Sequence, residues 1–446
     1  MTRLLDFLAV ASLGVLAALV VAVAALPLTG MGHLLLAGAL LLLAVTLKLA
    51  RPARYYRFLL LAIAGFLVLR YAIWRTAETL PSMDEPVTFA VGLALYAAEA
   101  YAMVMLAINL LVVIDPIRRE TPAWPEDPGA LPSVDVYVPS YNESPELVAN
   151  TLRAAVRLDY PTDRLRVYLL DDGASDQRLE SGDPQVAEAA RARRTALQEI
   201  CAEVGATYLN RVDNAGAKAG NLNAAFHRTN GDLIAIFDAD HAPMRDFLRH
   251  TVTHFLDDPR LFLVQTPHVF LNGDPLERNL GLEGRMPGES EMFYGLVQSG
   301  LDRWNASFFC GSAALLRRVA LAEENGFSGI SVTEDCETAL DLHARGWNSR
   351  YVAKPLVLGL NPETFSSFVG QRARWLQGMM QIFLKKNPLT RRGLSLAQRF
   401  CYLSSQMFWL FPLPRLIFFL APLAYLFAGL EIYVAALAGF LAHAIP

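Results

Sequence analysis

The sequence predicts an α/β domain inserted between two groups of α-helical transmembrane segments. Of its 446 residues, 54% are hydrophobic, which is too high a share for one soluble domain of ordinary composition. The apolar residues are concentrated at the two ends, whereas the middle part, roughly residues 115–386, carries most of the charges. Within this middle part, short β-rich runs alternate with helical patterns, as they do in α/β proteins.

Four apolar windows precede the middle part, and each approaches or reaches the length of about 20 residues that a helix needs to cross a membrane. They are Leu4–Leu28, Gly32–Leu49, Phe58–Trp74 and Val87–Ile114. A near-continuous apolar stretch from Phe400 to Ile445 follows the middle part and is long enough for a hairpin of two helices. Glu99 lies inside the fourth window, where an unpaired charge is costly, so we expect it to line a pore or to bind another helix.

The charged loops predict the orientation of these segments. Arginines follow the second and fourth windows, whereas acidic residues follow the third, so the positive-inside rule places the N-terminus and the middle part in the cytoplasm. We expect a transmembrane region of four helices at 1–120, a cytoplasmic domain at 121–364, interfacial amphipathic helices at 365–400 and a transmembrane hairpin at 401–446. The formal net charge of −4 argues against nucleic acid as a partner, because phosphate binding needs a concentrated basic surface.

Three short β-rich runs in the middle part predict strands. They are Val134–Pro139, Leu165–Leu170 and Leu233–Phe237. Strands that alternate with helices predict a parallel, doubly wound sheet, in which ligands bind beyond the carboxyl ends of the strands. Acidic motifs follow the second and third runs directly, so we expect both motifs at this edge of the sheet.

The two acidic motifs are candidates for nucleotide and metal binding. Asp171 and Asp172 belong to a D-D-G motif and can accept hydrogen bonds from a base or a ribose, although the same motif is common in ordinary turns. Asp238 and Asp240 belong to a D-A-D motif, in which the alternation of an extended chain points both carboxylates to one side. Such a pair suits Mg²⁺ or Mn²⁺ bridging to a nucleotide diphosphate. The alternative is a carboxylate that caps a helix.

Two further motifs carry groups for phosphate binding and proton transfer. Lys218 lies in N-A-G-A-K-A-G-N-L-N, where it can offer a positive charge to a phosphate, or it is a solvated lysine at the start of a helix. Asp335 ends a T-E-D motif and is a candidate general base for an acceptor hydroxyl. Glu337 is the alternative base, and Thr333 or Asp335 could instead cap the helix that follows.

A Q-R-A-R-W motif contributes Gln371, Arg374 and Trp375. It lies in Phe365–Leu384, a stretch with helical spacing of apolar residues that predicts an amphipathic helix at a membrane surface. Arg374 can bind phosphates, Gln371 can donate hydrogen bonds and Trp375 can offer a ring face to a sugar. A basic and aromatic belt at the membrane surface is the alternative, and both interpretations can hold together.

The ordered set of D-D-G, D-A-D, T-E-D and Q-R-A-R-W, followed by apolar spans, resembles the processive branch of the family 2 glycosyltransferases. These enzymes have a nucleotide-sugar-binding fold called GT-A. The intervening text is similar to bacterial cellulose synthase catalytic subunits in particular. It comprises Phe308–Ser312 (F-F-C-G-S), Gln265–His268 (Q-T-P-H) and Lys218–Asn221 (K-A-G-N).

The resemblance implies a role for each motif. It places UDP on Asp171 or Asp172 and on Lys218, with further donor contacts from Gln371 and Arg374. It makes Asp238 and Asp240 the ligands of Mg²⁺ or Mn²⁺, and Asp335 the general base. The residues implied for acceptor binding are Trp375, Phe308, Cys310 and Gly311.

The implied reaction is a single inverting transfer of glucose from UDP-glucose to the 4-hydroxyl of a growing β-1,4-glucan. The resemblance also implies a bacterial inner membrane, polymer export between the membrane helices and a periplasmic membrane-anchored accessory subunit. Relatives of this kind usually have further spans and a PilZ domain that binds cyclic di-GMP, and nothing here matches that module. The alternatives are a chitin, hyaluronan or mannan-type synthase, or a catalytically silent membrane scaffold.

Overall fold

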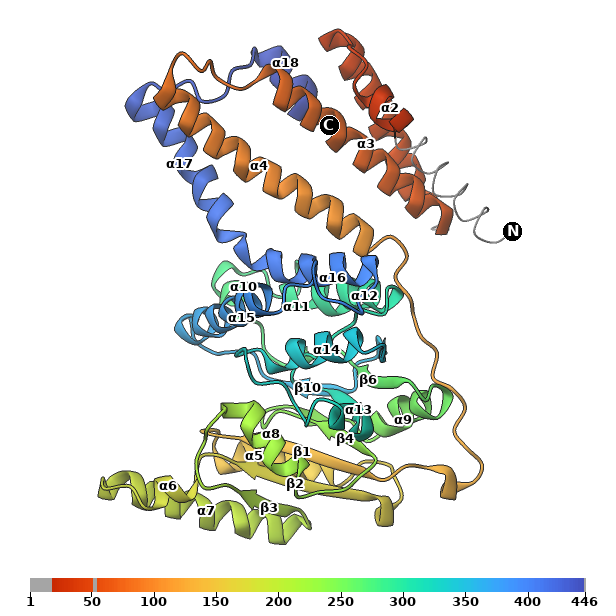
Figure 1. The fold of residues 1–446 in the computed structure, drawn as a ribbon, viewed down its shortest axis with the longest axis vertical. Coiled ribbons are helices and arrows are strands. Elements are labelled where there is room, and N and C mark those ends of the chain that lie inside the picture. The colour runs from red at the N-terminus through yellow and green to blue at the C-terminus, as the bar shows by residue number, and fades with distance from the viewer. Residues whose placement is uncertain (1–17, 51–53, 445–446) are drawn as a thin grey trace. The chain divides into compact units, whose positions relative to one another are not determined.

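The computed structural model describes residues 18–50 and 54–444 (Figure 1). The chain divides into one unit made of Met1–Ile114 with Leu410–Pro446, and a second unit made of Asp115–Trp409. These boundaries differ from those expected at residues 120 and 400. Residues 115–120 belong to the second unit because Arg119 pairs with Asp302 there, with 2.7 Å between Nε and Oδ2.

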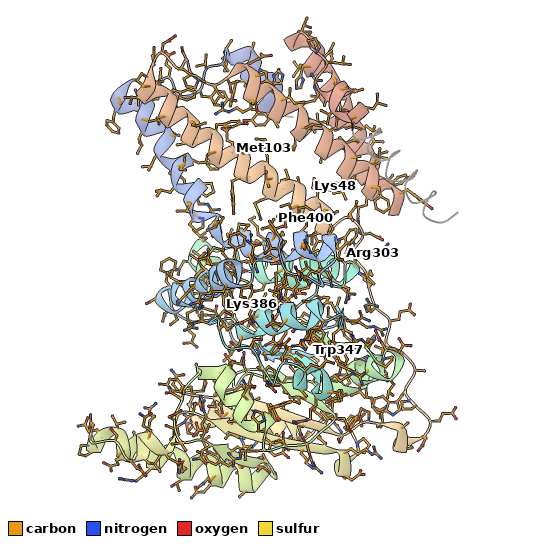
Figure 2. The ribbon with its side chains drawn as sticks, in the orientation of Figure 1. Lys48, Met103, Arg303, Trp347, Lys386 and Phe400 are labelled. Atoms are coloured by element: carbon orange, nitrogen blue, oxygen red, sulfur yellow. The ribbon has the colours of Figure 1, made fainter. Side chains whose placement is uncertain are left out.

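The chain around Phe400 (Figure 2) also belongs to the second unit. It forms α16 (Leu396–Met407), in which Cys401 and Tyr402 are fully buried. The Tyr402 hydroxyl shares a 2.7 Å hydrogen bond with Nδ1 of His343. This apolar segment therefore packs inside the α/β unit, which composition alone does not reveal.

The first unit consists of apolar helices. They are α2 (Gly30–Leu49), α3 (Arg54–Glu78), α4 (Pro86–Val112), α17 (Pro412–Ala428) and α18 (Leu437–Ala444). Three of them, α2, α3 and α4, are long and apolar enough to cross a membrane, which confirms the second, third and fourth windows as helices. Most of the first window, Leu4–Leu28, lies outside the described residues. These helices associate the chain with a membrane.

The apolar stretch beyond α16 forms two helices of unequal length. Helix α17 has 17 residues and ends at Gly429, whose φ of 64° is left-handed. Helix α18 has only eight residues, against the roughly 20 that a straight span needs. The break follows from Gly429, because a left-handed residue ends an α-helix, and from the polar Glu431 just beyond it.

Glu99 binds another helix, which is one of the two roles expected for it. Its Oε2 lies 2.5 Å from Nε of Arg75, so α4 is joined to α3 by an ion pair. The Arg75 side chain is fully buried and also donates to the Thr79 hydroxyl. Pairing offsets the cost of holding two charges between apolar helices.

The second unit is built on a seven-stranded sheet. In order across the sheet, its strands are β3 (Thr207–Asn210), β2 (Leu165–Asp171), β1 (Val134–Ser140), β4 (Leu233–Ile236), β8 (Ala314–Arg317), β6 (Leu261–Gln265) and β9 (Asn348–Tyr351). The three predicted strands are confirmed as β1, β2 and β4. They run parallel, with Tyr137 of β1 paired to Tyr168 of β2 and to Ile236 of β4.

The prediction of an all-parallel sheet is wrong, because β8 runs antiparallel to both β4 and β6. The chain enters β8 from the edge at which β4 ends, so Ala314 pairs with Ile236 and with Gln265. Left-handed backbone at Gly311 (φ 82°) and Ala313 (φ 53°) turns the chain into this strand. The antiparallel strand therefore brings the F-F-C-G-S segment to the carboxyl ends of β1, β2 and β4.

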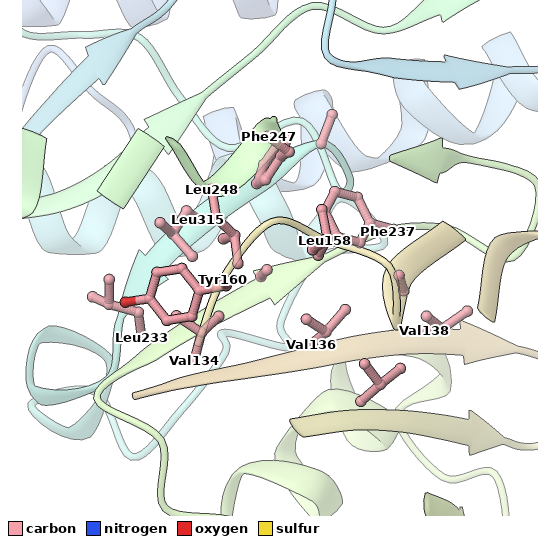
Figure 3. Close-up of a cluster of buried hydrophobic side chains, with 14 of the residues drawn as sticks. Val134, Val136, Val138, Leu158, Tyr160, Leu233, Phe237, Phe247, Leu248 and Leu315 are labelled. Atoms are coloured by element: carbon pink, nitrogen blue, oxygen red, sulfur yellow. The ribbon is translucent and has the colours of Figure 1, made fainter. Parts of the chain in front are cut away.

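Helices cover both faces of this sheet. One face carries α5 (Pro145–Ala155), α7 (Pro184–Val204) and α9 (Phe247–Asp257). Alternate residues of β1 point to it and pack in a cluster with Phe237 and Phe247 (Figure 3); they are Val134, Val136 and Val138. Each such side chain contributes roughly 1.5–3 kcal/mol of burial free energy. The opposite face carries α8 (Ala217–Phe226) and α13 (Arg318–Ala322).

The remaining elements complete the second unit. A small sheet contains β5 (Ala242–Pro243), β10 (Val357–Gly359) and β7 (Val269–Phe270). The other helices are α6 (Asp176–Leu179), α10 (Pro275–Leu280), α11 (Glu289–Met292), α12 (Gln298–Arg303), α14 (Glu334–Ala344) and α15 (Phe365–Lys385). Helix α15 confirms the helix predicted for the Q-R-A-R-W segment, and α14 confirms the one predicted after T-E-D.

Candidate active site

The D-D-G motif lies at the end of β2, as predicted, but its first carboxylate is fully occupied by the protein. Asp171 is buried, and its oxygens accept hydrogen bonds from Gly173 N and Arg193 Nε, both at 3.0 Å, and from the Tyr208 hydroxyl at 2.9 Å. Asp171 therefore holds the sheet edge together and leaves little room for a ligand.

Asp172 is held in a different way. Its two oxygens accept hydrogen bonds of 2.6 Å from Nε and Nη2 of Arg211, and 6% of its side chain is exposed. Burial raises the pKa of Asp172, while the Arg211 guanidinium opposes that shift. Of the two aspartates, only Asp172 reaches the surface, and it does so beside an arginine that the sequence analysis did not single out.

The D-A-D motif follows β4 and forms a group that can hold a metal ion. Ligand atoms of Asp238, Asp240 and His241 all lie within 4.8 Å of one another. About a third of each aspartate side chain is exposed, 34% for Asp238 and 36% for Asp240. The helix-cap alternative is wrong, because Asp240 leads into β5 and the next helix, α9, is preceded by Asp246.

His241 was missed by the sequence analysis, although it follows Asp240 directly. Its Nδ1 shares a 2.7 Å hydrogen bond with the Ser312 hydroxyl, which also accepts from the Asp238 N–H at 2.9 Å. This arrangement leaves Nε2 of His241 towards Asp240, at 4.0 Å from Oδ1. Two carboxylates and an imidazole are donors that suit a divalent cation.

Lys218 lies in the first turn of α8 and points towards Asp238. Together with Asp335, described next, these two residues form a cluster of charged side chains, called the Asp335 cluster below. Its ammonium group contacts the Asp238 carboxylate and donates a 2.9 Å hydrogen bond to the Gly311 carbonyl oxygen. Burial would lower the pKa of Lys218, but the charges of Asp238, Glu334 and Asp335 outweigh it and raise the pKa. Lys218 is therefore a fixed cation among these three carboxylates, and the alternative of a solvated lysine is wrong.

Asp335 lies in the first turn of α14 and joins this cluster at Gly311. A Cβ atom built on Gly311 would lie 3.1 Å from Oδ2 of Asp335 and 3.3 Å from Nζ of Lys218. Glycine suits the position because its φ is left-handed and a side chain would crowd both groups. The structure thus brings together parts of the T-E-D, D-A-D, K-A-G-N and F-F-C-G-S motifs.

The environment of Asp335 suits proton transfer near neutral pH. Burial and the charge of Glu334 raise the pKa of Asp335 to about 7, while the Cys336 N–H and Lys218 act in the opposite direction. A general base works best when its pKa lies near the working pH.

Glu337, the alternative base, faces away from the cluster. It is buried, its Oε1 lies 2.6 Å from Nζ of Lys386, and its Oε2 accepts from the Ser331 N–H at 2.8 Å. Thr333 precedes the helix but makes no capping hydrogen bond with its side chain. Of the two candidate bases, Asp335 and Glu337, it is therefore Asp335 that faces the cluster.

The F-F-C-G-S segment forms a wall beside this cluster. Phe308 is buried among aromatic rings, with 6.3 Å between its ring centroid and that of Tyr402. Cys310 donates its N–H to Oε1 of Gln265 at 2.9 Å, and its sulfur accepts from Nε2 of Gln298 at 3.1 Å. Burial and the nearby Asp335 raise the pKa of the Cys310 thiol, so it is a neutral group.

Helix α15 approaches the T-E-D loop with the face that carries Q-R-A-R-W. A Cβ on Gly378 would lie 2.3 Å from Oγ1 of Thr333, so helix and loop are in close contact. Helical spacing places Gln371, Arg374 and Trp375 on the same side as Gly378. Among the described residues, no hydrogen bond or ion pair joins Gln371 or Arg374 to the Asp335 cluster.

Trp375 lies partly exposed on that face, with 38% of its surface accessible. Its ring packs edge-on against Trp409, at 5.6 Å between centroids, and the Arg372 guanidinium lies 5.6 Å from its centroid. The structure therefore brings the helix of this motif to the T-E-D loop. Within the motif, Arg372 is paired with Glu289 at 2.7 Å.

Comparisons with known proteins agree with this arrangement. Residues 135–324 match the family model for glycosyl transferase family 2, and residues 233–445 match that for glycosyl transferase family group 2. The chain is 43% identical over 396 residues to cellulose synthase 1 of Komagataeibacter xylinus, which covers 89% of this chain and 24% of the relative. It is also 43% identical over 405 residues to the UDP-forming cellulose synthase catalytic subunit of Pseudomonas fluorescens (strain SBW25), with 91% and 52% covered.

A solved structure supports the fold. The mannosyltransferase PcManGT from Pyrobaculum calidifontis, in complex with GDP-Man and Mn²⁺, aligns with a TM-score of 0.50 and 22% identity, covering 80% of this chain and 97% of that one. The GT-A-type fold is thereby confirmed. The chain spans from about a quarter to about half the length of the two cellulose synthases. With both family models matched and this identity over most of its residues, the chain belongs to the family 2 glycosyltransferases and is a homologue of cellulose synthase catalytic subunits.

Proposed function

We propose that this chain carries the catalytic centre of a processive, inverting glycosyltransferase that transfers glucose from UDP-glucose to the 4-hydroxyl of a growing β-1,4-glucan. The observation that carries the proposal is the placement of Asp335, a carboxyl group with a pKa of about 7, beside Lys218 and the D-A-D motif. The names of the relatives, which are cellulose synthases, supply the sugar and the product.

The donor diphosphate would bind next to Asp238 and Asp240. Their carboxylates, with His241, fit a divalent cation such as Mg²⁺ or Mn²⁺, because their ligand atoms lie close together and stay partly exposed. When bound, such an ion supplies positive charge that stabilises the leaving diphosphate. Lys218 keeps a further positive charge beside Asp238.

Asp335 would act as the general base. It accepts the proton of the acceptor hydroxyl while the oxygen of that hydroxyl forms a bond to C1 of the sugar. The bond from C1 to the diphosphate oxygen breaks on the opposite side, so the configuration inverts and the electron pair leaves with UDP. A base with a pKa of about 7 is ionised over half the time above neutral pH and remains basic enough to take the proton.

The other motif residues would bind the two substrates. Asp172 is the member of D-D-G that reaches the surface, so it is the better candidate for the uridine contact. From α15, Gln371 and Arg374 would contact the donor, and Trp375 the end of the acceptor chain, for which a partly exposed ring is suited. Residues proposed to line the acceptor path are Phe308, Cys310 and Gly311.

The membrane arrangement is also a proposal. The α/β unit would lie in the cytoplasm of a bacterial cell, with α2, α3 and α4 in the inner membrane. Arginines follow α2 and α4, and the positive-inside rule places such loops in the cytoplasm. A periplasmic membrane-anchored subunit would receive the polymer, as the resemblance implies.

A donor screen tests which sugar is transferred. The chain, reconstituted in lipid with Mg²⁺ or Mn²⁺, should incorporate label from UDP-glucose and not from UDP-N-acetylglucosamine or GDP-mannose. A glucanase specific for β-1,4 linkages should then release the label. Incorporation from either of the other two donors alone would exclude glucose and favour a chitin, hyaluronan or mannan-type synthase.

The metal site has its own test. Asp240→Ala should abolish the dependence of UDP affinity on Mg²⁺, as measured by calorimetry with and without the ion. An equal gain in UDP affinity on adding Mg²⁺ to the variant and to the wild type would rule out Asp240 as a ligand.

A further inference from the structure

The last turns of helix α15 make three contacts that hold the loop leading into the T-E-D motif. The loop runs from Ser331 to Thr333, and Asp335 follows it at the start of α14. Close packing of Gly378 on Thr333 makes the first contact. The second is a hydrogen bond of 3.0 Å from the Val332 N–H to Oε1 of Gln381.

Lys386, labelled in Figure 2, makes the third contact through a buried carboxylate. Its ammonium group lies 2.6 Å from Oε1 of Glu337 and 2.5 Å from Oδ2 of Asp341, two buried residues of α14. The other oxygen of Glu337 accepts the Ser331 N–H at 2.8 Å. Consecutive backbone N–H groups of the loop, those of Ser331 and Val332, are thus held from one end of α15, the first through Glu337 and the second directly.

The same helix carries the residues proposed to bind the substrates. Arg374 and Trp375 lie only three or four residues before Gly378, which is about one helical turn, or about 5 Å along the axis. An α-helix is a rigid element, so the distance between these side chains and the loop contacts is set by the helix itself. The placement of Asp335 is therefore tied to the substrate-binding face of α15.

We propose that Lys386 and Gln381 are positioning residues, which hold Asp335 at the distance from the Q-R-A-R-W face that proton transfer requires. The inference rests on the proposed function for the meaning of that distance, but the contacts stand without it. Neither residue touches the Asp335 cluster, and their effect passes through Glu337 and through the loop backbone. A displacement of about 1 Å at a reacting group can lower a rate by as much as about a hundredfold.

A purely structural role is the competing explanation, since a buried ion pair commonly holds elements together and its loss is costly. The two roles differ in what they change. A structural role lowers stability and ligand binding together. A positioning role lowers kcat and loosens the loop. The metal-binding group after β4 and Asp172 after β2 do not depend on that loop, so the affinity for UDP with metal stays unchanged.

The test compares Lys386→Met and Gln381→Leu with Arg392→Met in the full chain in lipid. Arg392→Met also removes one positive charge, from an exposed side chain nearby, and serves as the matched control. We expect Lys386→Met and Gln381→Leu to lower kcat by about tenfold with the KM for the donor unchanged. Lys386→Arg should restore most of the rate, because it keeps the charge between Glu337 and Asp341. Gln381→Leu changes no charge, and residue 381 contacts Val332, which is exposed. This variant is therefore expected to fold.

Hydrogen exchange supplies a readout that does not depend on activity. Backbone amides of residues 330–336 should exchange faster in Lys386→Met and Gln381→Leu, and those of residues 236–241 should not change. Exchange and kcat equal to those of Arg392→Met would overturn the proposal, as would a parallel loss of UDP affinity. A wild-type chain that transfers no sugar from any donor would remove the proposed function, whereas unchanged exchange at 330–336 removes the positioning role by itself.

Discussion

The Lys218 ammonium group contacts the Asp238 carboxylate and holds it beside Gly311. Asp238 is also one of the three residues whose ligand atoms lie close enough to share a metal ion. Burial alone would raise the pKa of Asp238, but Lys218 and the neighbouring histidines lower it, so the carboxylate stays ionised. A cation that binds this group must therefore share the carboxylate with the lysine.

Removal of that lysine should strengthen metal binding while it weakens transfer. In Lys218→Met, the carboxylates of the cluster lose their nearest cation, so the affinity for Mn²⁺ without nucleotide should rise by about tenfold, or about 1.4 kcal/mol. Mn²⁺ titration followed by electron paramagnetic resonance measures this change. Lys354→Met is the control, because Lys354 pairs with Asp246 at 3.1 Å outside the cluster. Weaker Mn²⁺ binding in Lys218→Met would contradict the competition.

Asp335→Asn should separate chemistry from binding. The amide keeps the shape of the side chain but cannot take a proton, so the transfer rate should fall by roughly 10²–10⁴-fold, the range for loss of a general base. UDP affinity in the presence of Mg²⁺ should change little, because Asp335 is not one of the metal-binding group. Near-normal polymer synthesis by this variant would exclude Asp335 as the base.

The wild-type rate should depend on pH in a direction set by the same residue. Because burial and Glu334 raise the pKa of Asp335 to about 7, the reactive ionised form increases as the pH rises through 7. We expect kcat/KM for the donor to increase between pH 6 and pH 8 with an apparent pKa of about 7. A rate that is flat across this range would place the base elsewhere.

Stability should follow the opposite trend at this site. The pKa of Asp335 rises from 3.8 to about 7 on folding, so the folded chain binds more protons than the unfolded chain between these values. Its contribution to stability is present below pH 4 and is lost as the pH rises through 7. Asp335→Asn should therefore raise Tm relative to the wild type at pH 8, with a smaller difference at pH 5. Differential scanning fluorimetry at both pH values tests the sign.

Two glycines on α15 form a matched pair for the contact with the T-E-D loop. Gly378→Ala places a Cβ within 2.3 Å of Thr333 and should destabilise the chain by about 1–3 kcal/mol, as overpacking does, with a loss of transfer. Gly370→Ala meets nothing within 4 Å and should stabilise the helix by about 0.5–1 kcal/mol. Thermal unfolding and a transfer assay of both variants test the contact. Equal effects of the two substitutions would show that the loop moves to accommodate the added methyl group, which would contradict a tight contact between Gly378 and Thr333.

The local elements could be predicted because their signals lie within short stretches of chain. The strands β1, β2 and β4, the helices after T-E-D and around Q-R-A-R-W, and the apolar helices α2, α3 and α4 all follow from periodicity and composition. The acidic motifs at the strand ends followed from the same patterns, because a parallel strand presents its carboxyl end at the ligand-binding edge.

Other features depend on contacts between distant residues. Nothing near β8 in the sequence reveals that it runs antiparallel and carries Gly311 to Asp335. No motif marks Arg211 as the partner of Asp172, or Lys386 as the partner of Glu337. Composition likewise does not reveal that Cys401 and Tyr402 of α16 are buried within the α/β unit.

The sequence by itself determined that this protein has apolar helices around an α/β unit and which reactive residue types stand at the strand ends, because hydrophobic periodicity and turn chemistry act over a few residues. Only the tertiary structure shows that Asp335 faces Lys218 while Glu337 pairs with Lys386, and that Asp172 is less buried than Asp171. In each pair, the local sequence does not distinguish the two acidic residues. They differ in burial and in the cations that long-range packing places beside them, which are Lys218 and Lys386 for the first pair and Arg193 and Arg211 for the second.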